Sequence, residues 1–140
     1  MGMKVERVDT WAASIKDKPG GLTAKLAALA QAGVSLEFVI ARRTAEKKGL
    51  GVVFVTPIKG AAQCRAARKA GFSKTTSMHA LRVEGPDRRG IGAAITDAVA
   101  GAGINLRGLA ASAIGRKFIA HFAFDTSADA TKAGRLIRAM

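Results

Sequence analysis

The stretch Asp17-Lys18-Pro19-Gly20-Gly21 returns 70 positions later as Asp87-Arg88-Arg89-Gly90-Ile91. The same spacing separates Ala32-Gly33-Val34-Ser35-Leu36 from Ala102-Gly103-Ile104-Asn105-Leu106, and a segment of small and apolar residues joins the two motifs in each copy. A constant offset of half the 140 residues indicates two copies of one module, because self-similarity at a fixed period marks a duplicated unit. Whatever site the module carries should then be present twice.

The hydrophobic periodicity around the first turn predicts the elements of the first copy. Residues 8–15 alternate with Trp11, Ala13 and Ile15 on one face, as in a half-buried strand. Residues 21–32 follow a helical apolar stripe that ends at Gly33. Continuing along the chain, the pattern predicts strands over residues 34–42, 50–56 and 72–76 and a helix over residues 59–70. The first copy is therefore predicted to be βαββαβ.

The second copy repeats this order but is expected to stop early. We predict strands over residues 78–84, 104–112 and 118–125 and helices over residues 91–102 and 128–139, the last capped by Ser127. The prediction is an α+β protein of two ferredoxin-like modules, residues 1–77 and 78–140, each an antiparallel sheet with helices on one face. The second module is expected to lack its last strand, which would leave the strand around Leu81 and Val83 as an edge open to pairing.

Module size and strand composition both predict that each module needs a neighbour. A unit of about 70 residues is near the lower limit for an adequate core. The central strands are apolar on both faces: Val52 and Phe54 alternate with Val53 and Val55. Such strands are expected to be buried on both sides, so we predict that a sister module or a second chain covers the open sheet face, most simply in a homodimer.

Composition and charge narrow the class of protein. The chain is 49% hydrophobic and 24% charged, and its apolar runs are shorter than the roughly 20 residues of a membrane span. One cysteine, Cys64, excludes an intrachain disulfide, and with no apolar leader after Met1 we expect a cytoplasmic protein without a membrane partner. The net charge of +13 is dispersed over short basic pairs, which indicates solvated faces and turns, with an anion-binding surface as the alternative.

The paired motifs resemble those of the ACT domain, a small amino-acid-sensing regulatory module. The first copy resembles it in Asp17-Lys18-Pro19-Gly20 with Ala32-Gly33-Val34-Ser35-Leu36, and the second copy in Asp87-Arg88-Arg89-Gly90 with Ala102-Gly103-Ile104-Asn105-Leu106. The likeness covers nearly the whole chain, so the layout is similar to stand-alone tandem ACT proteins. The resemblance implies a non-enzymatic, allosteric regulator that binds a free amino acid or related metabolite near a module interface, without a cofactor.

The chemistry of the turn supports a ligand site independently of the resemblance. Glycine lets a ligand approach the main chain, and the first amides of the following helix are donors at the positive end of its dipole. A carboxylate fits there, and the preceding aspartate could meet an ammonium group. Ser35 and Asn105 are expected across the same end of each module. The predicted ligand-binding residues are Asp17, Gly20, Gly21, Leu22 and Ser35 in the first copy and Asp87, Gly90, Ile91 and Asn105 in the second.

Three other functions remain as alternatives. The first is an assembly module whose sites have lost their ligand. The second is an RNA-binding protein, since residues 116–124 are basic and aromatic, but the chain lacks tyrosine and nucleic acid is the less favoured partner. The third is an enzyme, which the sequence disfavours: His79 and His121 lie outside any metal-ligand pattern, and we assign no catalytic or metal-binding residue.

Overall fold

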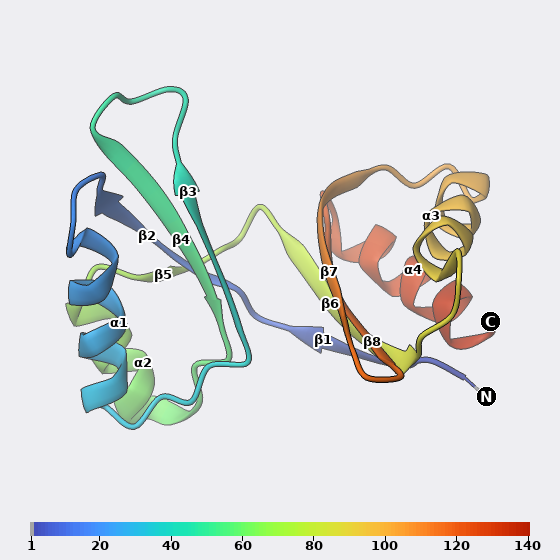
Figure 1. The fold of residues 1–140 in the computed structure, drawn as a ribbon, viewed down its shortest axis with the longest axis horizontal. Coiled ribbons are helices and arrows are strands. Elements are labelled where there is room, and N and C mark those ends of the chain that lie inside the picture. The colour runs from blue at the N-terminus through green and yellow to red at the C-terminus, as the bar shows by residue number, and fades with distance from the viewer. Residues whose placement is uncertain (1) are drawn as a thin grey trace. The chain divides into compact units, whose positions relative to one another are not determined.

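A computed structural model describes residues 2–140, which form two compact units (Figure 1). The first unit is Asp9–Thr75, and the second combines Thr76–Met140 with the N-terminal segment that ends at Val8. The predicted division into residues 1–77 and 78–140 therefore needs one correction. The change of unit falls between Thr75 and Thr76, but the segment before Asp9 belongs with the C-terminal half of the chain.

The first unit has the predicted βαββαβ order. Its elements are β2 (Trp11–Lys16), α1 (Gly21–Gln31), β3 (Phe38–Arg43), β4 (Leu50–Thr56), α2 (Gly60–Lys69) and β5 (Ser73–Lys74). The strands pair antiparallel in the order β3-β4-β2-β5. Figure 1 shows α1 and α2 on one face of this sheet, where Trp11, Leu29 and Phe72 lie in the buried core. The α+β fold class expected for this module is confirmed.

The second unit repeats this architecture with a different chain order. Its elements are β6 (His79–Pro86), α3 (Ile91–Gly101), β7 (Leu106–Ile114), β8 (Lys117–Phe124), α4 (Ser127–Arg138) and, from the start of the chain, β1 (Lys4–Val8). The sheet order is β1-β6-β8-β7, so β1 occupies the position that β5 has in the first unit. The prediction that the second module lacks a strand is thus corrected: its fourth strand comes from the N-terminus.

Strand β1 is held by main-chain and side-chain contacts within the second unit. It pairs with β6 over five positions, from Lys4 opposite Glu84 to Val8 opposite Ala80. Val5 is 8% exposed and belongs to the core, and Arg138 on α4 donates a 3.0 Å hydrogen bond to the Val5 carbonyl oxygen. Because β6 is paired on both sides, it is not the open edge that the sequence predicted around Leu81 and Val83; those residues lie in the core.

The start of α4 differs from expectation by one residue. The Asp129 amide donates to Thr126 Oγ1 at 3.0 Å, so Thr126 and not Ser127 is the N-cap. The capping chemistry is the one predicted, since a hydroxyl satisfies an amide that has no partner within the helix.

We predict that Val5→Ala destabilises the second unit by about 2 kcal/mol, because a well-packed core loses buried methyl groups and relaxes only partly around the gap. Val39→Ala is the matched control, since Val39 is 41% exposed on β3 of the first unit. Hydrogen exchange measured on peptides from β6 and β8 reports the effect. Equal losses for the two variants, or faster exchange confined to residues 9–75, would contradict the assignment of β1 to the second sheet.

Candidate ligand-binding site

In the first unit, a tight turn connects β2 to α1. The Asp17 amide donates to the Gly49 carbonyl oxygen at 3.0 Å, which ties the turn to the β3–β4 hairpin. Gly20 has φ 85°, a left-handed conformation that L side chains rarely adopt. A Cβ atom on Gly21 would collide with the Lys16 carbonyl oxygen. Both predicted glycines are therefore required by the backbone itself.

The second unit contains the same turn. The Asp87 amide donates to the Arg116 carbonyl oxygen at 2.7 Å, in the same way that the first turn is tied to its hairpin. Gly90 has φ 80°, and the Ile91 amide donates to the Arg88 carbonyl oxygen at 3.2 Å. The repeated sequence is thus a repeated backbone conformation.

The helices that follow these turns begin without a side-chain cap. Gly20 and Gly90 occupy the N-cap positions of α1 and α3, and no side chain caps either helix, in contrast to Thr126 at α4. The first turn of each helix also lacks an acidic residue. Amides at these positions have no partner within the helix and carry the positive end of the helix dipole, so they favour an anionic group.

A hollow of about 220 Å³ lies beside the first turn. It is lined by Ile15, Lys16, Asp17, Lys18, Leu22, Ala41, Arg42, Arg43 and Gly51. The lining comes from the end of β2, the start of α1, the end of β3 and the start of β4. Of the predicted residues, Asp17 and Leu22 line this hollow, while Gly20 and Gly21 shape the backbone beside it.

An arginine that the sequence did not single out contacts Asp17. Arg43 Nε lies 2.8 Å from Asp17 Oδ2, and the Asp17 side chain is 35% exposed. Arg43 is the last residue of β3 and pairs with Gly51 on β4. The Arg42-Arg43 pair is visible in the sequence, but its position beside the turn depends on the register of β3 against β4.

Ser35 and Asn105 do not lie at the end of the module where they were expected. Each follows the C-terminal end of its helix, whereas the turns precede the N-terminal ends. An 11-residue helix is about 16 Å long, so each polar side chain is separated from the turn of its own unit by a helix length. Within one unit, the turn residues and Ser35 or Asn105 do not form one cluster.

The surroundings of the second turn have diverged from those of the first. At the position equivalent to Arg43 stands Ala113, and within residues 2–140 no ion pair engages Asp87. Gly92 replaces Leu22, and a Cβ atom placed on Gly92 would meet no atom within 4 Å. The backbone of the site is duplicated, but its side chains are not.

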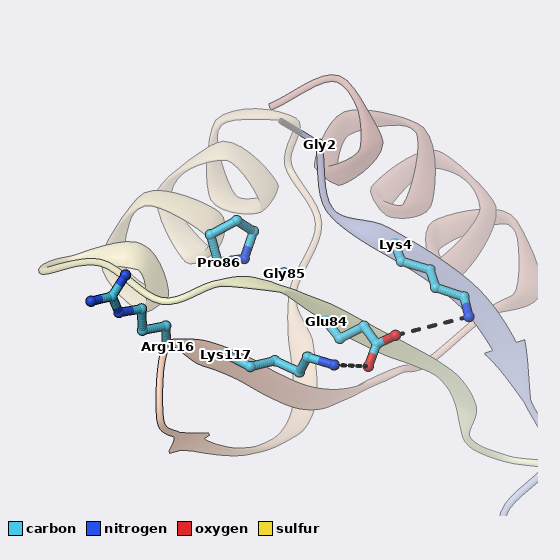
Figure 2. A pocket seen from close by; sticks show the side chains of 7 residues that line it. All are labelled: Gly2, Lys4, Glu84, Gly85, Pro86, Arg116 and Lys117. Atoms are coloured by element: carbon cyan, nitrogen blue, oxygen red, sulfur yellow. Dashed lines mark ion pairs between the residues drawn. The ribbon is translucent and has the colours of Figure 1, made fainter.

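A larger hollow, of about 400 Å³, lies in the second unit beside β1 (Figure 2). Its lining is Gly2, Lys4, Glu84, Gly85, Pro86, Arg116 and Lys117, which includes none of the predicted site residues. Figure 2 shows Glu84 between Lys4 and Lys117, whose Nζ atoms lie 3.8 and 4.0 Å from its carboxylate oxygens. Arg82 Nη2 is 3.3 Å from the same carboxylate. Because these ion pairs join β1, β6 and β8, we interpret the cluster as structural.

Residues 2–140 contain no cluster of metal-ligating side chains and no helix that could span a membrane. No three His, Cys, Asp or Glu side chains gather there as a metal site. In the same residues, every helix is too short or too polar to cross a bilayer, which takes about 20 apolar residues.

Comparison with known proteins supports the fold. No protein-family model matches the chain, and no curated protein matches its sequence. Among solved structures, the protein BT0572 from Bacteroides thetaiotaomicron is similar with a TM-score of 0.77 and 12% identity, over 92% of this chain and 87% of that one. The ligand-free regulatory subunit of aspartate kinase from Thermus thermophilus has a TM-score of 0.65 and 16% identity, over 98% and 95% of the two chains.

A third structure extends the same pattern. A putative C-terminal regulatory domain of aspartate kinase from Porphyromonas gingivalis W83 has a TM-score of 0.55 and 13% identity, over 96% of this chain and 94% of that one. At these identities the similarity establishes architecture alone. The chain has the fold of the aspartate kinase regulatory subunits, and the ACT-like fold predicted from its duplicated turns is confirmed.

Proposed function

We propose that the chain is a regulatory protein that binds a free amino acid or a closely related metabolite at the turn between β2 and α1. The observation that carries the proposal is the hollow beside this turn, where Asp17 and Leu22 lie next to an uncapped helix N-terminus. Similarity to structures described as regulatory subunits and domains of aspartate kinase supports a regulatory and non-catalytic role. The cytoplasmic location stays a prediction from composition.

The turn offers partners for both charged groups of an amino acid. The amides of Leu22 and Thr23 in the first turn of α1 would receive the α-carboxylate, since they lack partners within the helix, whereas the Gly21 amide donates to the Lys18 carbonyl oxygen at 3.0 Å. Asp17 Oδ2 contacts Arg43, which leaves Oδ1 for an ammonium group. Leu22 would supply an apolar wall for the ligand side chain. Ser35 or Asn105 would take part only if another module placed it beside the turn.

We further propose that binding acts through association between copies, most simply as a homodimer. In the second unit β7 is an edge strand, and its outer main-chain groups have no neighbour in the sheet. Leu109 and Ile114 are large apolar side chains exposed on this strand. An unprotected apolar edge strand favours pairing with another chain.

One observation favours the alternative of an assembly module without a ligand. Arg43 already contacts Asp17 at 2.8 Å. The carboxylate that would bind the ammonium group of a ligand is therefore already paired within the protein. On this alternative the turns persist because the backbone requires them, and no amino acid stabilises the chain.

We predict that the Tm of the full chain rises with the concentration of at least one free amino acid. A ligand at about 100 times its Kd adds about 2.7 kcal/mol to the free energy of unfolding. Ala41→Trp should abolish this response, because an indole placed in the lining fills the hollow. Ala111→Trp is the matched control, since residue 111 is the repeat equivalent of residue 41 and both are exposed on their strands. No response to any amino acid would favour the assembly alternative, and loss of the response only in Ala111→Trp would place the site at the second turn.

We predict that Ile114→Lys converts the dimer to monomer, because a charge replaces an apolar side chain that is 71% exposed on the free edge. Sedimentation velocity across a concentration series measures the change. Met140→Lys, an equivalent change at an exposed apolar residue outside β7, should leave the dimer intact. A wild-type chain that sediments as a monomer at every concentration would refute association through this edge.

A further inference from the structure

We propose that one end of the second unit binds the phosphate backbone of a nucleic acid duplex. This basic end consists of residues 87–90, between β6 and α3, and residues 115–117, at the hairpin of β7 and β8. It contains four cations and one carboxylate, those of Arg88, Arg89, Arg116, Lys117 and Asp87. None of these residues lines the hollow of the first unit, so the surface is separate from the proposed amino-acid site.

The two segments of the basic end are joined through the main chain. The Asp87 amide donates to the Arg116 carbonyl oxygen at 2.7 Å, and Arg88 and Arg89 follow Asp87 directly. All three arginines are exposed. They lie outside the strands, so the alternation that sends strand neighbours to opposite faces of a sheet does not separate them. Two basic pairs that are far apart in the sequence therefore meet at one end of the fold.

The protein does not neutralise the three arginines. Within residues 2–140, no acidic side chain forms an ion pair with Arg88, Arg89 or Arg116. Lys117 differs, since its Nζ atom lies 4.0 Å from the Glu84 carboxylate, and Figure 2 shows Arg116 directed away from that group. A free guanidinium group can donate two parallel hydrogen bonds to the oxygens of one phosphate.

The composition of the basic end favours a nucleic acid over an acidic protein. Protein interfaces depend on apolar and aromatic side chains at their centre, but every residue of 87–90 and 115–117 is charged or glycine. The net charge of +13 adds a long-range attraction for polyanions. That attraction is strongest for the ligand with the densest charge, and a duplex carries one negative charge per roughly 1.7 Å of its axis.

Burial of the aromatic residues on β8 favours a duplex over a single strand. Phe118, Phe122 and Phe124 are at most 6% exposed and belong to the core of the second unit. Proteins that bind single strands stack the bases on exposed aromatic rings, which these side chains cannot offer. The RNA-binding mode suggested by the sequence of residues 116–124 is therefore replaced by contact with the backbone alone. Such contact does not depend on base sequence.

Fluorescence anisotropy of the full chain tests the proposal with a labelled DNA duplex and an RNA duplex of the same sequence. We expect a Kd of about 10⁻⁶ to 10⁻⁴ M at physiological salt, unchanged when the base sequence is shuffled. The logarithm of the binding constant should fall linearly with the logarithm of salt concentration, by about 0.9 per phosphate contact. Single-stranded DNA and polyglutamate form the comparison arms.

Charge-matched variants test whether the basic end makes the contact. The triple variant Arg88→Gln, Arg89→Gln and Arg116→Gln should reduce the salt slope by about 2 to 3 and weaken binding at least about tenfold. Arg65→Gln with Lys69→Gln and Arg135→Gln is the matched control, since it removes the same charge from exposed positions on α2 and α4. The control should bind within about twofold of the wild type, and an unchanged Tm shows that each variant is folded.

Binding of either duplex with a loss confined to the first triple variant supports the proposal, and the tighter duplex identifies DNA or RNA as the partner. An equal loss in the control assigns binding to general charge and overturns the proposal. Tighter binding of the single strand, or equally tight binding of polyglutamate, also overturns it in favour of another class of partner. Absence of binding by both duplexes overturns it as well. The amino-acid response of Tm is measured separately, so the proposed function stands or fails independently.

Discussion

The pairing of β1 with β6 is the interaction on which the second unit depends. Without it β6 would be an edge strand, and the carbonyl group of Val5 would not meet Arg138 on α4. The contact is reinforced from both sides of the sheet. Val5 pairs with Val83 and belongs to the core, and Lys4 lies 3.8 Å from Glu84, which Lys117 approaches from β8. The first residues of the chain therefore complete a sheet whose other strands all come after Thr75, so the second unit is complete only when both ends of the chain are in place.

Most of the architecture could be predicted because the local periodicity of apolar residues indicates the strands and helices. The strand and helix stripes and the terminal glycines depend on neighbouring residues, and with the constant offset they predict the βαββαβ order of the first copy and the βαββα order of the second. The pairing of β1 with β6 cannot be predicted from local periodicity. Residues 4–8, Lys-Val-Glu-Arg-Val, lie outside the repeat, and a period of two does not tell which sheet a strand joins. The sequence indicated that β6 needs a partner only because the second copy lacks its last strand.

The residues of the candidate site were likewise predictable only where the evidence for them lies in one short segment. The turn residues Asp17, Gly20 and Gly21 were predictable, because one short segment contains the strand end, the positive φ and the close approach to the Lys16 carbonyl oxygen. Arg43 was not, since its 2.8 Å contact with Asp17 requires the register of β3 on β4. Ser35 and Asn105 were misplaced for a related reason. Their repeat position suggested a shared role, but the direction of α1 and α3 puts each a helix length from its turn.

The backbone conformation of the turn and the charge beside it therefore depend on different residues. The collision that a Cβ on Gly21 would cause and the left-handed φ of Gly20 and Gly90 are properties of the chain's path, and they hold with or without a ligand. Repetition of the glycines is therefore evidence for a repeated fold. The residues that differ between copies, above all Arg43 against Ala113, contribute no comparable backbone constraint. Because the path does not fix them, their charge can differ between the copies, and any difference in binding between the two turns would come from these residues.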